Sequence, residues 1–139
     1  MSYKAINAYK KDSLKQQLTN ADPHKITLML MSGAIDRLAF AKGCIERKDL
    51  SGKSQYLSKT TAILINLRDT IEMKTNPEFS QNLYALYDYM LDKIGEANIT
   101  NTIDPLHEVS ELLTPIRDAW AQIPDAAKQV ALAQKEAVG

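Results

Sequence analysis

The chain of 139 residues has very little cysteine and no net charge. Its single cysteine, Cys44, excludes intramolecular disulfides and zinc sites built from several cysteines, and we expect it to be a small buried hydrophobe. Lysine plus arginine number 17, as do aspartate plus glutamate. No excess of positive charge therefore attracts a nucleic acid or an acidic lipid surface, and we predict no nucleic-acid partner.

The sequence also lacks a long hydrophobic run. Apolar runs such as Leu28 to Met31 and Ala62 to Ile65 have four residues, whereas a membrane-spanning helix needs roughly 20. The first residues, Met1 to Asn7, contain no apolar core of a signal peptide. We therefore expect a cytoplasmic chain, of single-domain length, with no direct membrane insertion.

Residue clusters that carry catalysis or bind cofactors are missing as well. His24 and His107 lie in different predicted helices, where solvated or capping roles are expected. The sequence has no His-Glu-x-x-His pair, no glycine-rich phosphate loop and no Glu-x-x-His motif of di-iron bundles. We predict a protein that is not an enzyme, with no catalytic residue, no cofactor and no metal site.

The sequence does contain clear signals for the starts and ends of helices. Asp22 before Pro23, and Asn76 before Pro77, each place a capping side chain ahead of a proline at the first helical position. Turn residues at 48–52 and 98–102 separate further helical patterns, and Pro124 ends the last one. In the first of these turns, either Asp49 or Ser51 can cap the helix that follows. The predicted helices are 23–46, 50–73, 77–98 and 103–122, with a bend at Pro115. Because short loops between long helices favour antiparallel neighbours, the expected fold is all-α, an antiparallel up-down four-helix bundle over residues 22–123.

Two segments flank the predicted bundle. Residues 1–21 form a weakly amphipathic stretch, which predicts a short N-terminal helical segment that packs on the bundle or frays. Residues 124–139 are rich in alanine, lysine and glutamine, which predicts a marginal helix or a mobile tail.

Helical spacing also predicts which side chains form the core. Each of the four helices contributes one stripe, and the stripes are Leu30, Ala34, Leu38, Ala41 and Ile45; Leu57, Thr61, Leu64, Leu67 or Arg68, and Ile71; Leu83, Leu86, Met90, Ile94 and Ala97; and Leu106, Val109, Leu113, Ile116, Trp120 and Ile123.

The helix over 23–46 has more apolar side chains than one stripe requires. At 100° per residue, Met29 and Phe40 lie about 100° to one side of the stripe, and Leu28 with Ile35 lies about 120° to the other. Three interpretations follow: a central helix buried on all sides, grooves for amphipathic segments of another protein, or a homodimer face.

Two sequence stretches resemble the flagellar secretion chaperones of the FliS family. The first is Asp22-Pro23-His24-Lys25-Ile26-Thr27-Leu28-Met29-Leu30-Met31-Ser32-Gly33-Ala34-Ile35, and the second is Leu83-Tyr84-Ala85-Leu86-Tyr87-Asp88-Tyr89-Met90, followed by Glu96-Ala97-Asn98. The stretch Arg117 to Trp120 also resembles the last helix of the family. The resemblance covers residues 3 to 122.

The resemblance implies an export chaperone that binds the disordered C-terminal region of flagellin in hydrophobic surface grooves. It would prevent premature polymerisation of flagellin and deliver it to the flagellar type III export gate. The candidate flagellin-binding groove residues are Leu28, Met31, Ile35, Tyr56, Ile63, Tyr84 and Leu91.

Ile6-Asn7-Ala8-Tyr9 resembles the short Ile-x-x-Tyr element near the start of these chaperones. The resemblance implies that residues 1–21 act as a lid over an empty groove, and that Ile6 and Tyr9 contact the export-gate protein once the client displaces the lid. A helical adaptor that binds an anti-sigma factor or another flagellar regulator, and a homodimeric structural bundle, are the alternatives.

Overall fold

The computed structural model describes residues 22–123, and its regular elements there are all helices. These are α2 (Pro23–Glu46), α3 (Leu50–Asp69), α4 (Pro77–Thr100) and α5 (Asp104–Ala121). The predicted all-α fold is therefore confirmed, and the helix bounds agree within a few residues of the ranges expected from the sequence. The expected N-terminal segment and C-terminal tail lie outside the described residues.

Three helices begin at the side-chain caps that the sequence predicts. The Asp22 carboxylate accepts a hydrogen bond from the Lys25 amide at 2.8 Å, and Asn76 Oδ1 accepts one from the Phe79 amide at 3.2 Å. Asp49, rather than Ser51, caps α3 by accepting from the Gly52 amide at 3.0 Å. Each cap satisfies a backbone N–H that has no partner within the first turn of its helix.

α3 ends at Asp69, four residues before the predicted end at residue 73. Glu72 explains the difference, because its carboxylate accepts hydrogen bonds from the amides of Lys74 and Thr75 and folds this stretch into a turn. The Ser80 hydroxyl donates to the Glu72 carbonyl at 2.5 Å, which ties the turn to α4. α5 runs without interruption through Pro115.

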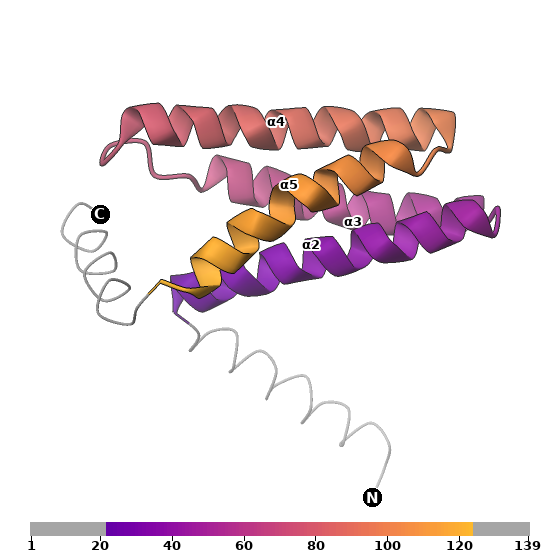
Figure 1. The fold of residues 1–139 in the computed structure, drawn as a ribbon, viewed down its shortest axis with the longest axis horizontal. Helices are drawn as coiled ribbons and strands as arrows, with labels where there is room; N and C mark the ends of the chain where they lie inside the picture. The colour runs from indigo at the N-terminus through magenta and orange to yellow at the C-terminus, as the bar shows by residue number, and fades with distance from the viewer. Residues whose placement is uncertain (1–21, 124–139) are drawn as a thin grey trace, which may run out of the picture.

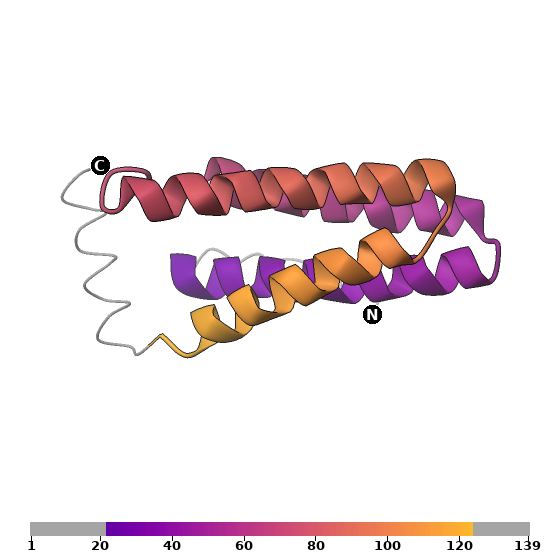
Figure 2. The ribbon, with the colours of Figure 1, turned by 45° about the horizontal axis from the view of Figure 1, so that its top comes forward.

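The helices alternate in direction, so that α2 and α4 run one way and α3 and α5 the other (Figure 1). α2 packs against α3 and α5, and α4 packs against the same two helices. α5 runs obliquely: it begins beside the end of α4 and finishes beside the start of α2, as the second view also shows (Figure 2). Within residues 22–123 the chain is thus the predicted antiparallel up-down bundle.

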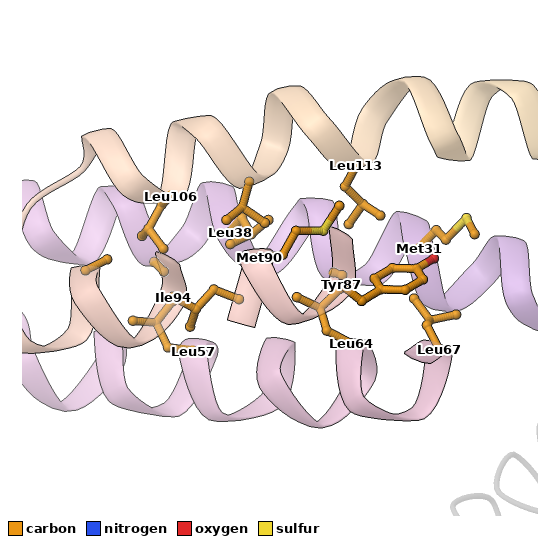
Figure 3. Close-up of a cluster of buried hydrophobic side chains, with 14 residues drawn as sticks. Met31, Leu38, Leu57, Leu64, Leu67, Tyr87, Met90, Ile94, Leu106 and Leu113 are labelled. Carbon is orange, nitrogen blue, oxygen red and sulfur yellow. The ribbon is translucent and has the colours of Figure 1, made fainter. Parts of the chain in front are cut away.

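Side chains from all four helices meet in one core between them (Figure 3). Ala34, Leu38, Leu64, Met90 and Leu106 are completely covered. Tyr87 is also only 1% exposed, and burial raises the pKa of its hydroxyl to about 12. Cys44 is a free, buried thiol, as expected for a small hydrophobe.

The predicted core stripes are off by one residue at several places. Met31, Thr60 and Tyr87 are buried, where the sequence pattern favoured Leu30, Thr61 and Leu86. A shift of one residue turns the buried face by about 100°. The cause is that each helix packs against two neighbours, so its buried face points between them, and a single-helix pattern does not fix that direction.

Candidate binding surface

One apolar surface outside the core lies along α2 and α3. The Phe40 and Tyr56 rings pack with centroids 5.3 Å apart, and a Cβ placed on Gly33 would lie 3.9 Å from Ile63 Cδ1. Met29, one turn before Gly33, is 56% exposed, and Phe40 is 54% exposed. We call this surface the α2–α3 face: Met29, Gly33, Phe40, Tyr56 and Ile63.

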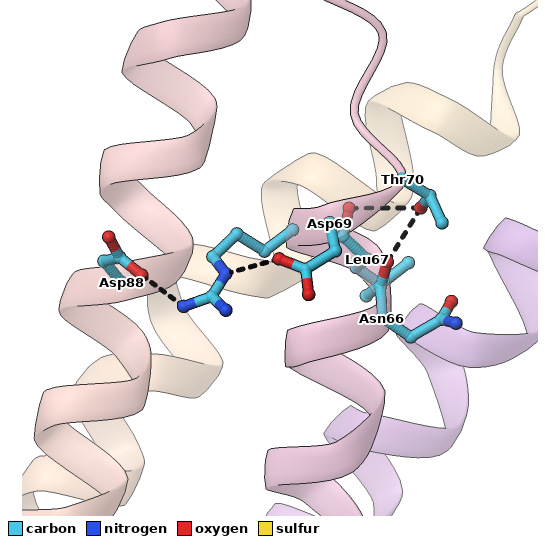
Figure 4. Close-up of polar contacts among 6 residues, drawn as sticks. Asn66, Leu67, Asp69, Thr70 and Asp88 are labelled. Carbon is cyan, nitrogen blue, oxygen red and sulfur yellow. Dashed lines mark hydrogen bonds and ion pairs between the residues drawn. The ribbon is translucent and has the colours of Figure 1, made fainter.

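A second, more polar surface lies between α3 and α4. Arg68 of α3 donates to the Asp88 carboxylate of α4 at 2.7 Å and to Asp69 at 2.9 Å (Figure 4). The hydrogen bond to Asp88, with that to Asp69, holds the pKa of the Arg68 guanidinium above its usual range. The same guanidinium lies 5.2 Å from the centre of the Tyr84 ring. Arg68 thus covers one of the predicted groove residues and ties two helices together.

The side of α2 that faces α5 carries a third set of apolar residues. Leu28 and Ile35 follow His24 by four and eleven residues, and these spacings place all three on one side of the helix. His24 contacts α5 directly, because its Nε2 lies 2.7 Å from the Trp120 carbonyl oxygen. Leu28 and Ile35 are both partly buried.

His24 and Trp120 join the start of α2 to the end of α5. The Trp120 indole N–H donates to the His24 carbonyl at 3.0 Å, and the two rings stack with centroids 5.0 Å apart and planes 10° apart. His24 is 7% exposed, so a solvated role for it is wrong. Its ring instead contacts a carbonyl in the last turn of α5, a capping contact to another helix. A contact between residues 96 positions apart leaves no local signal in the sequence. His107, in contrast, is exposed and pairs with Glu111.

The structure does not bring the seven predicted groove residues into one groove. Tyr56 and Ile63 belong to the α2–α3 face, and Tyr84 lies against Arg68 beside α3. Leu91, seven residues after Tyr84, shares its side of α4. Leu28 and Ile35 lie on the α5 side of α2, while Met31 is 3% exposed within the core.

The sequence-based selection omitted the most exposed apolar side chains of α2. Met29 and Phe40 were assigned to an apolar flank of that helix, and only the pairing with α3 shows that Tyr56 and Ile63 extend the same flank. Ile6 and Tyr9, the predicted lid and export-gate contacts, lie outside the described residues.

The described residues offer little for cofactor or metal chemistry. Between residues 22 and 123, no group of three or more histidine, cysteine, aspartate or glutamate side chains could hold a metal ion. A small polar pocket between α4 and α5 is lined by Lys93, Glu96, Asp104 and Glu108, among others. No helix in the described part of the chain is long and apolar enough to cross a membrane.

Comparison with known proteins shows which family this chain belongs to. Residues 5–127 match the family model described as flagellar protein FliS. The chain is 40% identical over 120 residues to the flagellar secretion chaperone FliS of Vibrio cholerae, which covers 86% of this chain and 88% of that protein. It is 35% identical over 117 residues to the flagellar secretion chaperone FliSB of Pseudomonas aeruginosa, and this match covers 84% of this chain and 93% of that protein.

A solved structure has a similar fold. It is described as a crystal structure of a flagellar chaperone from bacteria, and it superposes with a TM-score of 0.67 over 81% of this chain and 94% of that chain. The sequence identity is 16%, so this similarity concerns the fold alone.

Proposed function

This chain belongs to the FliS family of flagellar secretion chaperones, and we propose that its client is the C-terminal region of flagellin, which it binds on apolar surfaces of the bundle. The family is one of chaperones and not of enzymes. In this proposal the chain acts before export, because it covers the segment of flagellin through which subunits would polymerise.

The observation that carries the proposal is the α2–α3 face. Met29 and Phe40 are each more than half exposed. Phe40 packs on Tyr56 of α3, and Gly33, one turn after Met29, lies beside Ile63 of α3. Two helices side by side form a surface on which the apolar side of a third helix packs. Covering the exposed half of a methionine or phenylalanine side chain contributes roughly 1 kcal/mol each.

Coupled folding and binding suits such a surface. A disordered client segment loses conformational freedom when it becomes helical, and this cost offsets part of the favourable burial. A chaperone whose client must leave again benefits from this balance, because affinity stays moderate although the covered surface is large. The same segment would contact more than one face, which accounts for predicted groove residues on α2, α3 and α4.

Delivery forms the second part of the proposal. We infer that the bundle carries flagellin through the cytoplasm to the flagellar type III export gate. Ile6 and Tyr9 would contact the export-gate protein once residues 1–21 no longer act as a lid. An anti-sigma factor or another flagellar regulator stays a predicted additional partner.

Titration with a recombinant C-terminal fragment of flagellin tests the proposal. We expect saturable binding by calorimetry, together with a gain of far-ultraviolet circular dichroism at 222 nm beyond the sum of the separate proteins. A scrambled fragment of the same composition is the control. Binding without any gain in helicity would contradict the coupled folding, and no binding at all would refute flagellin as the client.

A further inference from the structure

The bundle buries the apolar side of α4 less completely toward the start of that helix. Phe79, Leu83 and Met90 share one side of α4, at spacings of four and eleven residues. Met90 is completely covered, Leu83 is partly buried and Phe79 is 62% exposed. Burial falls in the same way toward the end of α5, where Leu113 is completely covered but Ile116, three residues later, is only partly buried. We call this region, Phe79, Leu83 and Ile116, the open end of the core.

The course of α5 explains the open end of the core. Near the start of α5, Glu108 pairs with Lys93 of α4 at 3.6 Å. Near its end, Trp120 donates to the His24 carbonyl of α2 at 3.0 Å. α5 therefore crosses from α4 to α2, and both views show its last turns apart from the first turns of α4 (Figures 1 and 2). The first turns of α4 thus lack the apolar neighbour that α5 provides further along the helix.

The sequence after α5 has the pattern of one more amphipathic helix. Pro124 cannot continue α5, and Pro124 followed by Asp125 suits the first turn of a new helix. At 100° per residue, one side of that helix carries small apolar residues: Ala126, Val130, Ala133 and Ala137. All charged residues of this segment lie more than about 100° from Val130. The segment therefore has one narrow apolar side made of small side chains.

We propose that residues 125–138 fold back as a helix over the open end of the core, with Val130 beside Phe79 and Leu83. As a helix these residues are about 21 Å long, and the stretch of α4 from Phe79 to Met90 is about 16 Å long. Small side chains on the covering helix fit between the large ones of the open end. Because the segment belongs to the same chain, its effective concentration is high and a weak intrinsic affinity suffices. While it is in place, it excludes other apolar segments from this end.

Residues 1–21 are a poorer match to the open end of the core. Tyr9 and Leu18 are nine residues apart, so they fall on opposite sides of a helix. That segment therefore has no continuous apolar side of the length that α4 exposes. It also leaves from α2, which packs against α3 and α5, whereas residues 124–139 leave from α5, whose end borders the open end directly. The inference goes beyond the proposed function and does not depend on flagellin as the client.

Thiol labelling of the full chain tests the inference. Cys44, the single native cysteine, is 1% exposed, so one introduced cysteine can be labelled by itself. The probe is Val130→Cys, and the matched control is Leu132→Cys, about 200° away around the same helix and therefore on its outer side. The rate of reaction with N-ethylmaleimide is measured for each folded variant and divided by its rate in denaturant, which removes differences in intrinsic reactivity.

We expect Val130→Cys to react at least about tenfold more slowly than Leu132→Cys, the protection of a segment that is bound about nine-tenths of the time. Adding Phe79→Asp should bring the rate of Val130→Cys to within about twofold of that of Leu132→Cys. Adding Ile99→Asp, twenty residues further along α4, should leave the protection unchanged. Phe79 is 62% exposed, so the bundle should persist in these variants, and circular dichroism checks it.

Four results would overturn the inference. Equal rates for Val130→Cys and Leu132→Cys would show that the segment covers nothing, and protection that Phe79→Asp leaves unchanged would place it elsewhere on the bundle. Protection that increases with protein concentration would assign the open end to a second copy of the chain. Protection of a Phe79→Cys probe that Leu18→Asp removes and Val130→Asp does not would assign it to residues 1–21.

Discussion

Tyr87 is the largest side chain that the bundle covers almost completely. A phenolate in this position would carry a charge within the apolar core, and burial therefore raises the pKa of the hydroxyl to about 12. Because the folded state holds this proton more tightly than the unfolded chain, Tyr87 contributes stability below the usual tyrosine pKa of about 10. That contribution is lost as the pH rises from about 10 toward 12.

The substitution Tyr87→Phe should remove this loss of stability at alkaline pH. We expect the variant to differ by less than about 1.5 kcal/mol from the unmodified chain at neutral pH. Between about pH 10 and 12, the unmodified chain should lose up to about 3 kcal/mol of unfolding free energy that the variant retains. Urea unfolding at a series of pH values measures both. Other groups that titrate in this range, such as Tyr89 and Lys93, are common to both proteins and so cancel in the comparison. If the unfolding free energies of the two proteins change in parallel with pH, ionisation of Tyr87 does not destabilise the fold.

For single residues, the sequence predicts those contacts that are made between near neighbours in the chain. Asp22 and Asn76 cap their helices through amides three residues away, and both contacts follow from the local pattern. Burial of Tyr87 in place of Leu86 does not follow, because it depends on where α3 and α5 lie around α4. The contact of His24 with Trp120 depends on the whole fold, and the sequence pattern does not indicate that these two residues meet.

Pairs of helices, and not single helices, form the candidate binding surface. The apolar surplus of α2 is visible in the sequence, including the flank that carries Met29 and Phe40. The packing of the helices decides which neighbour lies beside each flank. α3 lies beside the flank that carries Phe40, and α5 contacts His24, which is on the same side of α2 as Leu28 and Ile35. The predicted groove residues therefore divide among separate faces, although each of them lies on a helix of the expected bounds.

A charge on the α2–α3 face should separate binding from folding. Phe40→Asp places a carboxylate where the side chain is already 54% exposed, so the fold should persist while the affinity for the flagellin tail falls about tenfold. Ile99→Asp is the matched control, since Ile99 is 82% exposed on α4, a helix that contributes no residue to this face. Circular dichroism checks the fold, and calorimetry measures the affinity.

Equal affinities of Phe40→Asp and Ile99→Asp would place the client elsewhere on the bundle. The combined substitution Leu28→Asp/Ile35→Asp then tests the α5 side of α2, where we also expect weaker tail binding. If that variant is folded and binds the tail with full affinity, Leu28 and Ile35 do not belong to the groove.

For the molecule as a whole, the contact between His24 and Trp120 fixes where the bundle connects to the rest of the chain. It joins the start of α2 to the end of α5, so residues 22 and 123 lie at the same end of the bundle (Figure 1). Residues 1–21, which include Ile6 and Tyr9, are therefore attached at this end, where α2 begins and α5 ends.

The proposed roles of the bundle and of residues 1–21 predict separable functions. Ile6→Ala/Tyr9→Ala should leave the affinity for the flagellin tail within about twofold of that of the unmodified chain, because neither residue belongs to the proposed client surface. The same variant should bind the cytoplasmic part of the export-gate protein at least about tenfold more weakly in the presence of the tail, since Ile6 and Tyr9 are the proposed contacts. Calorimetry with each partner separates the two effects, and Lys4→Ala/Lys10→Ala is a control in the same segment. Loss of tail binding with undiminished gate binding would show that Ile6 and Tyr9 hold the client and not the gate.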